Sequence, residues 1–78
     1  MTTDELLKRV TVDRNVCGGK PVVKGTRLPV AVILGGLAEG LSFEELIDHY
    51  PQITNDDIRA ALAYGADLAE ENTWKFAV

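Results

Sequence analysis

The sequence predicts a mostly α-helical protein in which a short N-terminal β-hairpin precedes a trihelical, helix-turn-helix-like (homeodomain-like) bundle. A turn-rich segment at residues 12–29, with three glycines and two prolines, predicts the hairpin. Two later segments, 41–46 and 53–58, each carry the signature of a helix N-terminus. We expect a single domain over residues 1–78, with the hairpin at 9–28, helices at 29–39, 43–49 and 55–71, and an extended tail at 73–78.

Residues 9–28 are predicted to form the hairpin because strand-like and turn-like segments alternate. Polar and apolar residues alternate over residues 9–13, which would direct Val10 and Val12 inward on a first strand. After a turn and a Gly-Gly reversal, residues 21–24 form the second candidate strand, and its proline suits a strand start or an edge. A two-stranded hairpin is marginal alone, so it must pack on helices or pair with another chain.

The first helix of the bundle is bounded by Pro29 and Gly40. Proline fits the first position of a helix, where its missing N–H is not needed, and glycine is the usual left-handed stop. Inside this helix, Gly35 and Gly36 each cost about 1 kcal/mol relative to alanine. We expect tight packing within the domain at these glycines. Farther upstream, residues 3–6 would form one short helical turn.

The other two helices have clear N-terminal caps. Ser42 can cap the amide of Glu45, and Glu45 can reach back, which makes a capping box. Thr54 is the expected cap of the last helix, and two acids, Asp56 and Asp57, follow at the positive end of its dipole. Helical periodicity predicts that the buried side of the last helix consists of Ile58, Ala61, Leu62, Gly65, Ala66 and Ala69.

The chain is short, and its composition limits how its core can be completed. A 78-residue domain buries only roughly 60% of its unfolded surface. One cysteine rules out an internal disulfide, and one cysteine with one histidine cannot form a zinc site within one chain. We therefore expect no metal or cofactor, and a homo-oligomer or an obligate complex. Without a signal-peptide pattern or a membrane-spanning run, we expect the protein in the cytoplasm and not in a membrane.

Charge is divided unevenly along the chain, although the net charge is −4. Residues 1–38 carry six cations and three acids, whereas residues 39–78 carry two cations and nine acids. Nothing in the basic segment resembles a catalytic centre, and its glycines match no phosphate-loop spacing. We expect a binding protein and not an enzyme, with no catalytic residues. The candidate partner-binding cations are Arg14, Lys20, Lys24 and Arg27.

Three short helices with tight turns are typical of DNA-binding helix-turn-helix domains, in which the last helix commonly enters the major groove. Such a helix usually begins with Arg, Lys, Asn or Gln. Here it begins with Asn55, Asp56 and Asp57, and Arg59 is its one cation. Because carboxylates are repelled by phosphates, the sequence favours the trihelical fold but not groove reading by this helix.

The C-terminal tail places Trp74, Phe76 and Val78 at alternate positions, which would align them on one face of an extended segment. Two interpretations stay open. The tail would either fold back onto the domain's own core or add as a strand to a partner, with Trp74 and Phe76 as partner-binding anchors.

Three segments resemble one protein family. They are Asn15–Val30 (NVCGGKPVVKGTRLPV), Gly40–Leu46 (GLSFEEL) and Tyr50–Tyr64 (YPQITNDDIRAALAY). Over residues 9–66 the chain resembles the small prokaryotic domain-of-unknown-function family 433, whose members are regarded as antitoxin-like. The resemblance implies a β-hairpin followed by a helix-turn-helix-like bundle. It also implies a VapB-type role, with a PIN-like nuclease toxin as the partner that the protein binds and silences.

The expected function is therefore that of an antitoxin of a type II toxin–antitoxin module, acting by direct protein binding. A PIN-like nuclease holds its metal with clustered carboxylates, so Lys24 and Arg27 are candidates to contact them, with Arg14 and Lys20 behind. The alternative is a helix-turn-helix DNA-binding transcriptional regulator that acts on its own operon as a dimer or a toxin complex. In a third interpretation the cations are only hairpin architecture and the tail does all the binding.

Overall fold

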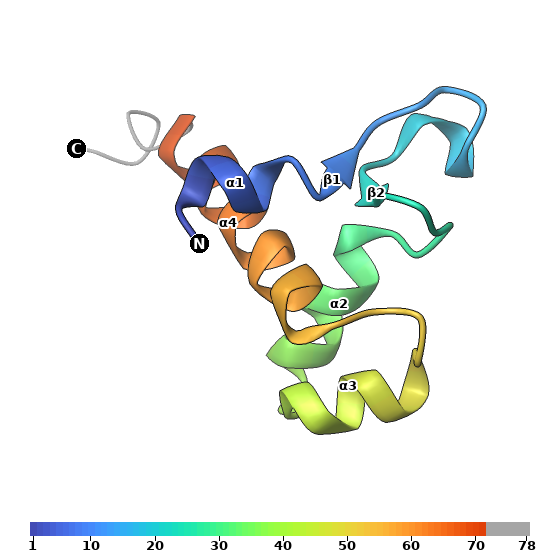
Figure 1. The fold of residues 1–78 in the computed structure, drawn as a ribbon, viewed down its shortest axis with the longest axis vertical. Coiled ribbons are helices and arrows are strands. Elements are labelled where there is room, and N and C mark those ends of the chain that lie inside the picture. The colour runs from blue at the N-terminus through green and yellow to red at the C-terminus, as the bar shows by residue number, and fades with distance from the viewer. Residues whose placement is uncertain (72–78) are drawn as a thin grey trace.

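The computed structural model describes residues 1–71, which form a helical body with a hairpin and its loops at one end (Figure 1). The fold is mostly helical with a short antiparallel hairpin, as predicted. The elements in chain order are α1 (Thr3–Leu7), β1 (Val10–Thr11), the 3₁₀ turn η1 (Cys17–Gly19), β2 (Val22–Val23), α2 (Val30–Ala38), α3 (Phe43–His49) and α4 (Asn55–Glu71). The tail with Trp74 and Phe76 lies outside the described residues.

Each strand of the hairpin is two residues long. β1 pairs with β2 in antiparallel register, Val10 opposite Val23 and Thr11 opposite Val22. The far edge of β2 pairs with the chain at Pro29 through an isolated bridge. This places β2 in the middle, and both of its valines are buried. The prediction that Val12 faces inward is wrong, because β1 ends at Thr11 and Val12 is 58% exposed.

Local sequence signals end α2 and begin α3 as expected. Gly40 has a φ of +99°, and its N–H donates to the carbonyl of Leu37 while that of Leu41 donates to the carbonyl of Gly36. These bonds form a Schellman stop. Ser42 and Glu45 then form the predicted capping box. Pro29 differs slightly from prediction, since it is the extended residue before α2 and not its first residue.

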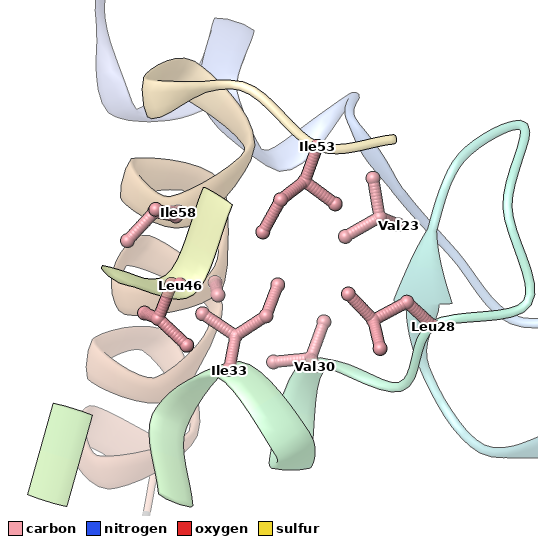
Figure 2. Packing of buried hydrophobic residues seen from close by; sticks show 8 residues of the cluster. Val23, Leu28, Val30, Ile33, Leu46, Ile53 and Ile58 are labelled. Atoms are coloured by element: carbon pink, nitrogen blue, oxygen red, sulfur yellow. The ribbon is translucent and has the colours of Figure 1, made fainter. Parts of the chain in front are cut away.

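The core lies where α2, α3, α4 and the hairpin meet, as Figure 2 shows. Ile33 from α2, Leu46 from α3 and Ile58 from α4 are completely buried. Val23 and Leu28 close this cluster on the hairpin side. The hairpin is therefore anchored by the same apolar contacts that hold the helices together, which gives its loops a fixed base.

Two features of the helical body differ from the sequence-based expectation. α1 is a full short helix with its own capping box between Thr2 and Glu5, and it packs against α4. The buried side of α4 includes Asp57 and Ala60 in addition to the expected Ile58 and Ala61. The expectation is wrong for Leu62, Ala66 and Ala69, which are exposed. α4 packs against α1 as well as against α2 and α3, so its buried face is not set by the trihelical bundle alone.

Candidate partner-binding surface

A tight turn presents Lys24 and Arg27 at the end of the hairpin. The backbone N–H of Thr26 donates to the carbonyl of Val23 at 3.0 Å, and Gly25 has a φ of +83°. This geometry suits a type II turn, which needs glycine at its third position. The hydroxyl of Thr26 donates to the same carbonyl at 2.8 Å.

The exit of this turn is fixed as well. The backbone N–H of Leu28 donates to the Thr26 hydroxyl at 3.0 Å, and the N–H of Val23 donates to the carbonyl of Leu28. Both Lys24 and Arg27 are exposed, so their charged groups reach solvent from a backbone with little freedom.

The second loop of the hairpin end, residues 13–20, carries Arg14 and Lys20. The Asp13 carboxylate accepts from the N–H of Asn15 at 2.8 Å, and the Asp13 carbonyl accepts from the N–H of Val16. Farther along, the thiol of Cys17 donates to the carbonyl of Arg27, with the sulfur and oxygen 3.1 Å apart. This bond joins the 13–20 loop to the 24–27 turn.

All four predicted cations are exposed, and none of them forms an ion pair with any residue from 1 to 71. Arg9 behaves differently. Its guanidinium lies 3.2 Å from the Asp57 carboxylate and 3.7 Å from that of Asp56, so its charge is used inside the fold. The hairpin end therefore keeps a positive surface.

The four cations do not converge on one point. An open groove of about 650 Å³ separates the 13–16 loop from the 24–27 turn, and Arg27 lines it. Lys24 lines a different hollow of about 450 Å³ beside Arg9. Arg14 and Lys20 line neither hollow. Sequence reasoning missed most of the groove wall, namely Thr11, Asp13, Val16, Thr26 and Gln52.

The leading turn of α4 is occupied by contacts within the protein. One Asp57 oxygen accepts from the backbone N–H of Thr54 at 2.9 Å, and the other accepts from Arg9. The Thr54 hydroxyl in turn accepts from the N–H of Asp57 at 3.2 Å, which confirms Thr54 as the cap. Asp57 is buried, and both of its carboxylate oxygens accept hydrogen bonds within the fold. The neighbouring Asp56 side chain is 40% exposed, so the turn keeps an acidic surface.

Over residues 1–71, no group of three or more His, Cys, Asp or Glu side chains is placed to hold a metal ion. No helix in this part of the chain is long and apolar enough to cross a membrane.

Comparison with known proteins places the chain in a family. Residues 10–65 match the model of DUF433, described as a protein of unknown function. The chain is 38% identical over 55 residues to the uncharacterized protein y4eO of Sinorhizobium fredii, with 70% of this chain aligned. It spans about a quarter of the length of that protein (25%).

A solved structure supports the same assignment. The fold matches a crystal structure of a DUF433 member protein from Anabaena variabilis with a TM-score of 0.75 and 28% sequence identity. The match covers 96% of this chain and 74% of the other. Given the family match over most of its residues, the chain belongs to the DUF433 family.

Proposed function

We propose that this chain is an antitoxin-like protein of a type II toxin–antitoxin module, which neutralises a PIN-like nuclease toxin by binding it directly. One observation carries the proposal. Lys24 and Arg27 project from a turn fixed by hydrogen bonds, and neither has an acidic partner among residues 1–71. A surface of this kind suits an anionic partner and is already ordered before binding.

The clustered carboxylates that hold the metal of a PIN-like nuclease are such a partner. Arg27 is the better candidate to reach them, since a guanidinium can bind a carboxylate through two parallel hydrogen bonds. A guanidinium seated there would compete with the metal ion and exclude RNA. Inhibition would then require no chemistry by this chain, only contact.

The experiment uses a purified PIN-like nuclease encoded beside this gene. Its affinity for the chain is measured by calorimetry, and its cleavage of a labelled RNA is followed in parallel. Arg27→Ala is expected to weaken binding at least about tenfold, the usual effect of losing a buried charged contact. Arg59→Ala is the matched control, because Arg59 is an exposed cation on α4, far along the chain from the hairpin. Absence of binding by the wild-type chain rejects the proposal.

A second candidate function, DNA binding, is favoured by the same unpaired cations, because phosphates are anionic too. The two acids in the first turn of α4, Asp56 and Asp57, disfavour it for the usual recognition helix, because carboxylates are repelled by phosphates. Salt separates the candidates. Affinity for a DNA duplex carrying the operon's own promoter would fall steeply between 50 and 200 mM salt, by roughly a thousandfold for six phosphate contacts. A packed protein interface would change far less.

A further inference from the structure

We propose that the groove between the 13–16 loop and the 24–27 turn binds an extended segment of the partner protein, one that carries a carboxylate beside an apolar side chain. Arg27 would hold the carboxylate, and the groove floor beside Val16 would take the apolar side chain. This inference rests on the proposed function for the identity of the partner, but the chemistry of the groove stands by itself.

The groove has the size and shape for such a segment. Its volume of about 650 Å³ falls within the range of roughly 300–1,000 Å³ that is typical of binding sites. Val16 is half-buried in its wall, with the completely buried Val22 beneath. Thr11 and Gln52 add neutral polar groups that can pair with a peptide backbone. An open groove of this kind fits a few side chains of an extended chain.

The charges of the groove indicate what it binds. Arg27 supplies a guanidinium that is exposed and free of ion pairs within residues 1–71. Asp13 supplies a carboxylate to the same lining, yet the two form no ion pair. A carboxylate in the wall repels a continuous phosphate backbone but leaves room for a single carboxylate at the guanidinium. The groove therefore favours a protein segment over a nucleic acid.

The walls are also held at a fixed separation. The bond from the Cys17 thiol to the Arg27 carbonyl joins the loop behind one wall to the turn that forms the other. The Thr26 hydroxyl fixes the turn itself. Because the walls are already ordered, this chain loses little conformational entropy when a short segment binds, which favours its affinity.

The first test does not involve the toxin. A phage library of random peptides is selected on the full chain and sequenced, and the enriched peptides are synthesised and their affinities measured. We expect enrichment of Asp or Glu next to apolar residues. Arg27→Ala should weaken these peptides at least about tenfold, and Gln52→Trp, which fills the groove, should do the same. Arg59→Ala and Ala66→Trp are matched controls at exposed positions on α4 outside the groove lining, and they should bind as the wild type does.

A sharper variant is Asp13→Asn, which keeps an oxygen for the N–H of Asn15 but removes the negative charge. It should tighten the binding of acidic peptides severalfold, whereas a merely structural role for Asp13 would weaken or not change binding. The groove proposal is rejected if the library yields no acidic peptides. It is also rejected if the selected peptides bind Gln52→Trp as tightly as they bind the wild type. A third contrary result is that no peptide binds, while a labelled RNA or duplex DNA binds the wild type and Gln52→Trp abolishes that binding.

The same variants then separate this inference from the proposed function. If the peptides bind but the wild-type chain does not bind the nuclease, the groove stands and the antitoxin role fails. If the nuclease binds wild type and Gln52→Trp equally, the antitoxin role stands and the groove is rejected.

Discussion

The thiol of Cys17 donates a hydrogen bond to the backbone carbonyl of Arg27, although the two residues belong to different loops. Cys17 itself has a φ of +51°, a left-handed conformation that is uncommon outside glycine. Cys17 therefore shapes the hairpin end in two ways. Its backbone turns the 13–20 loop, and its thiol joins that loop to the 24–27 turn. Arg27 lines the groove, whereas Cys17, whose thiol holds the Arg27 backbone, lies outside the groove lining.

We expect Cys17→Ala to lower the free energy of unfolding by about 0.5–1.5 kcal/mol, the usual net contribution of one hydrogen bond. Cys17→Ser keeps a donor and should lose less. Urea denaturation followed by circular dichroism measures both values. Equal losses for the two variants would show that the thiol hydrogen bond does not stabilise the fold.

The turn between β2 and α2 should depend on Gly25. An added Cβ there would meet nothing within 4 Å, so only the backbone conformation opposes a side chain. Gly25→Ala should therefore cost about 1–2 kcal/mol of unfolding free energy. Gly25→Asn should cost less, because asparagine tolerates positive φ better than alanine does. Matching losses in denaturation experiments would contradict the conformational explanation.

Features of this fold that depend on neighbouring residues could be predicted from the sequence. The caps at Ser42 and Thr54 and the stop at Gly40 each involve residues at most a few positions apart, and the structure has all three. The buried face of α4 could not be read in the same way. It depends on α1, which is distant in sequence and packs against α4, and on Arg9, which follows α1 and pairs with Asp57.

The candidate site likewise has a part that could be predicted from neighbouring residues and a part that depends on residues distant in sequence. The cations of the hairpin end stand out in the sequence as a group, and the structure leaves them exposed. The groove does not stand out, because Gln52 comes from the turn before α4 while Asp13 and Arg27 come from two loops of the hairpin. These segments also supply residues to the common core, namely Ile53 beside Gln52, and Val23 and Leu28 on either side of the 24–27 turn.

Two neighbouring glycines in α2 should respond to alanine with opposite signs. A Cβ on Gly35 would meet nothing within 4 Å, so Gly35→Ala should raise stability by about 0.5–1 kcal/mol. A Cβ on Gly36 would lie 2.8 Å from a methyl carbon of Leu46, which is completely buried and has little room to move. Gly36→Ala should cost about 1–3 kcal/mol. Thermal denaturation of the pair tests the packing, and a stabilised Gly36→Ala would refute it.

The Asp57 carboxylate should contribute far more to stability than that of Asp56. Asp57 caps α4 and pairs with Arg9 through a side chain that is 11% exposed. Asp57→Ala should therefore cost about 2 kcal/mol. Asp56 makes only long contacts, at 3.7 and 3.8 Å, from a side chain that is 40% exposed. Asp56→Ala should cost under about 1 kcal/mol. Similar losses in urea denaturation would mean that the cap and the Arg9 pair contribute little.

The capping box of α3 should make stability depend on pH through Glu45. Its carboxylate accepts from the backbone N–H of Ser42, and this bond, helped by the Ser42 hydroxyl, holds the pKa of Glu45 below its ordinary value of 4.5. With a lower pKa in the folded state, the unfolded chain binds more protons in this range, so the contribution is complete above pH 4.5 and is lost as the pH falls through the folded pKa. Glu45→Gln should therefore flatten the fall in unfolding free energy below pH 4.5 relative to the wild type. Urea denaturation from pH 3 to 6 measures the slopes, and an unchanged slope in Glu45→Gln would show that this cap does not favour the charged carboxylate.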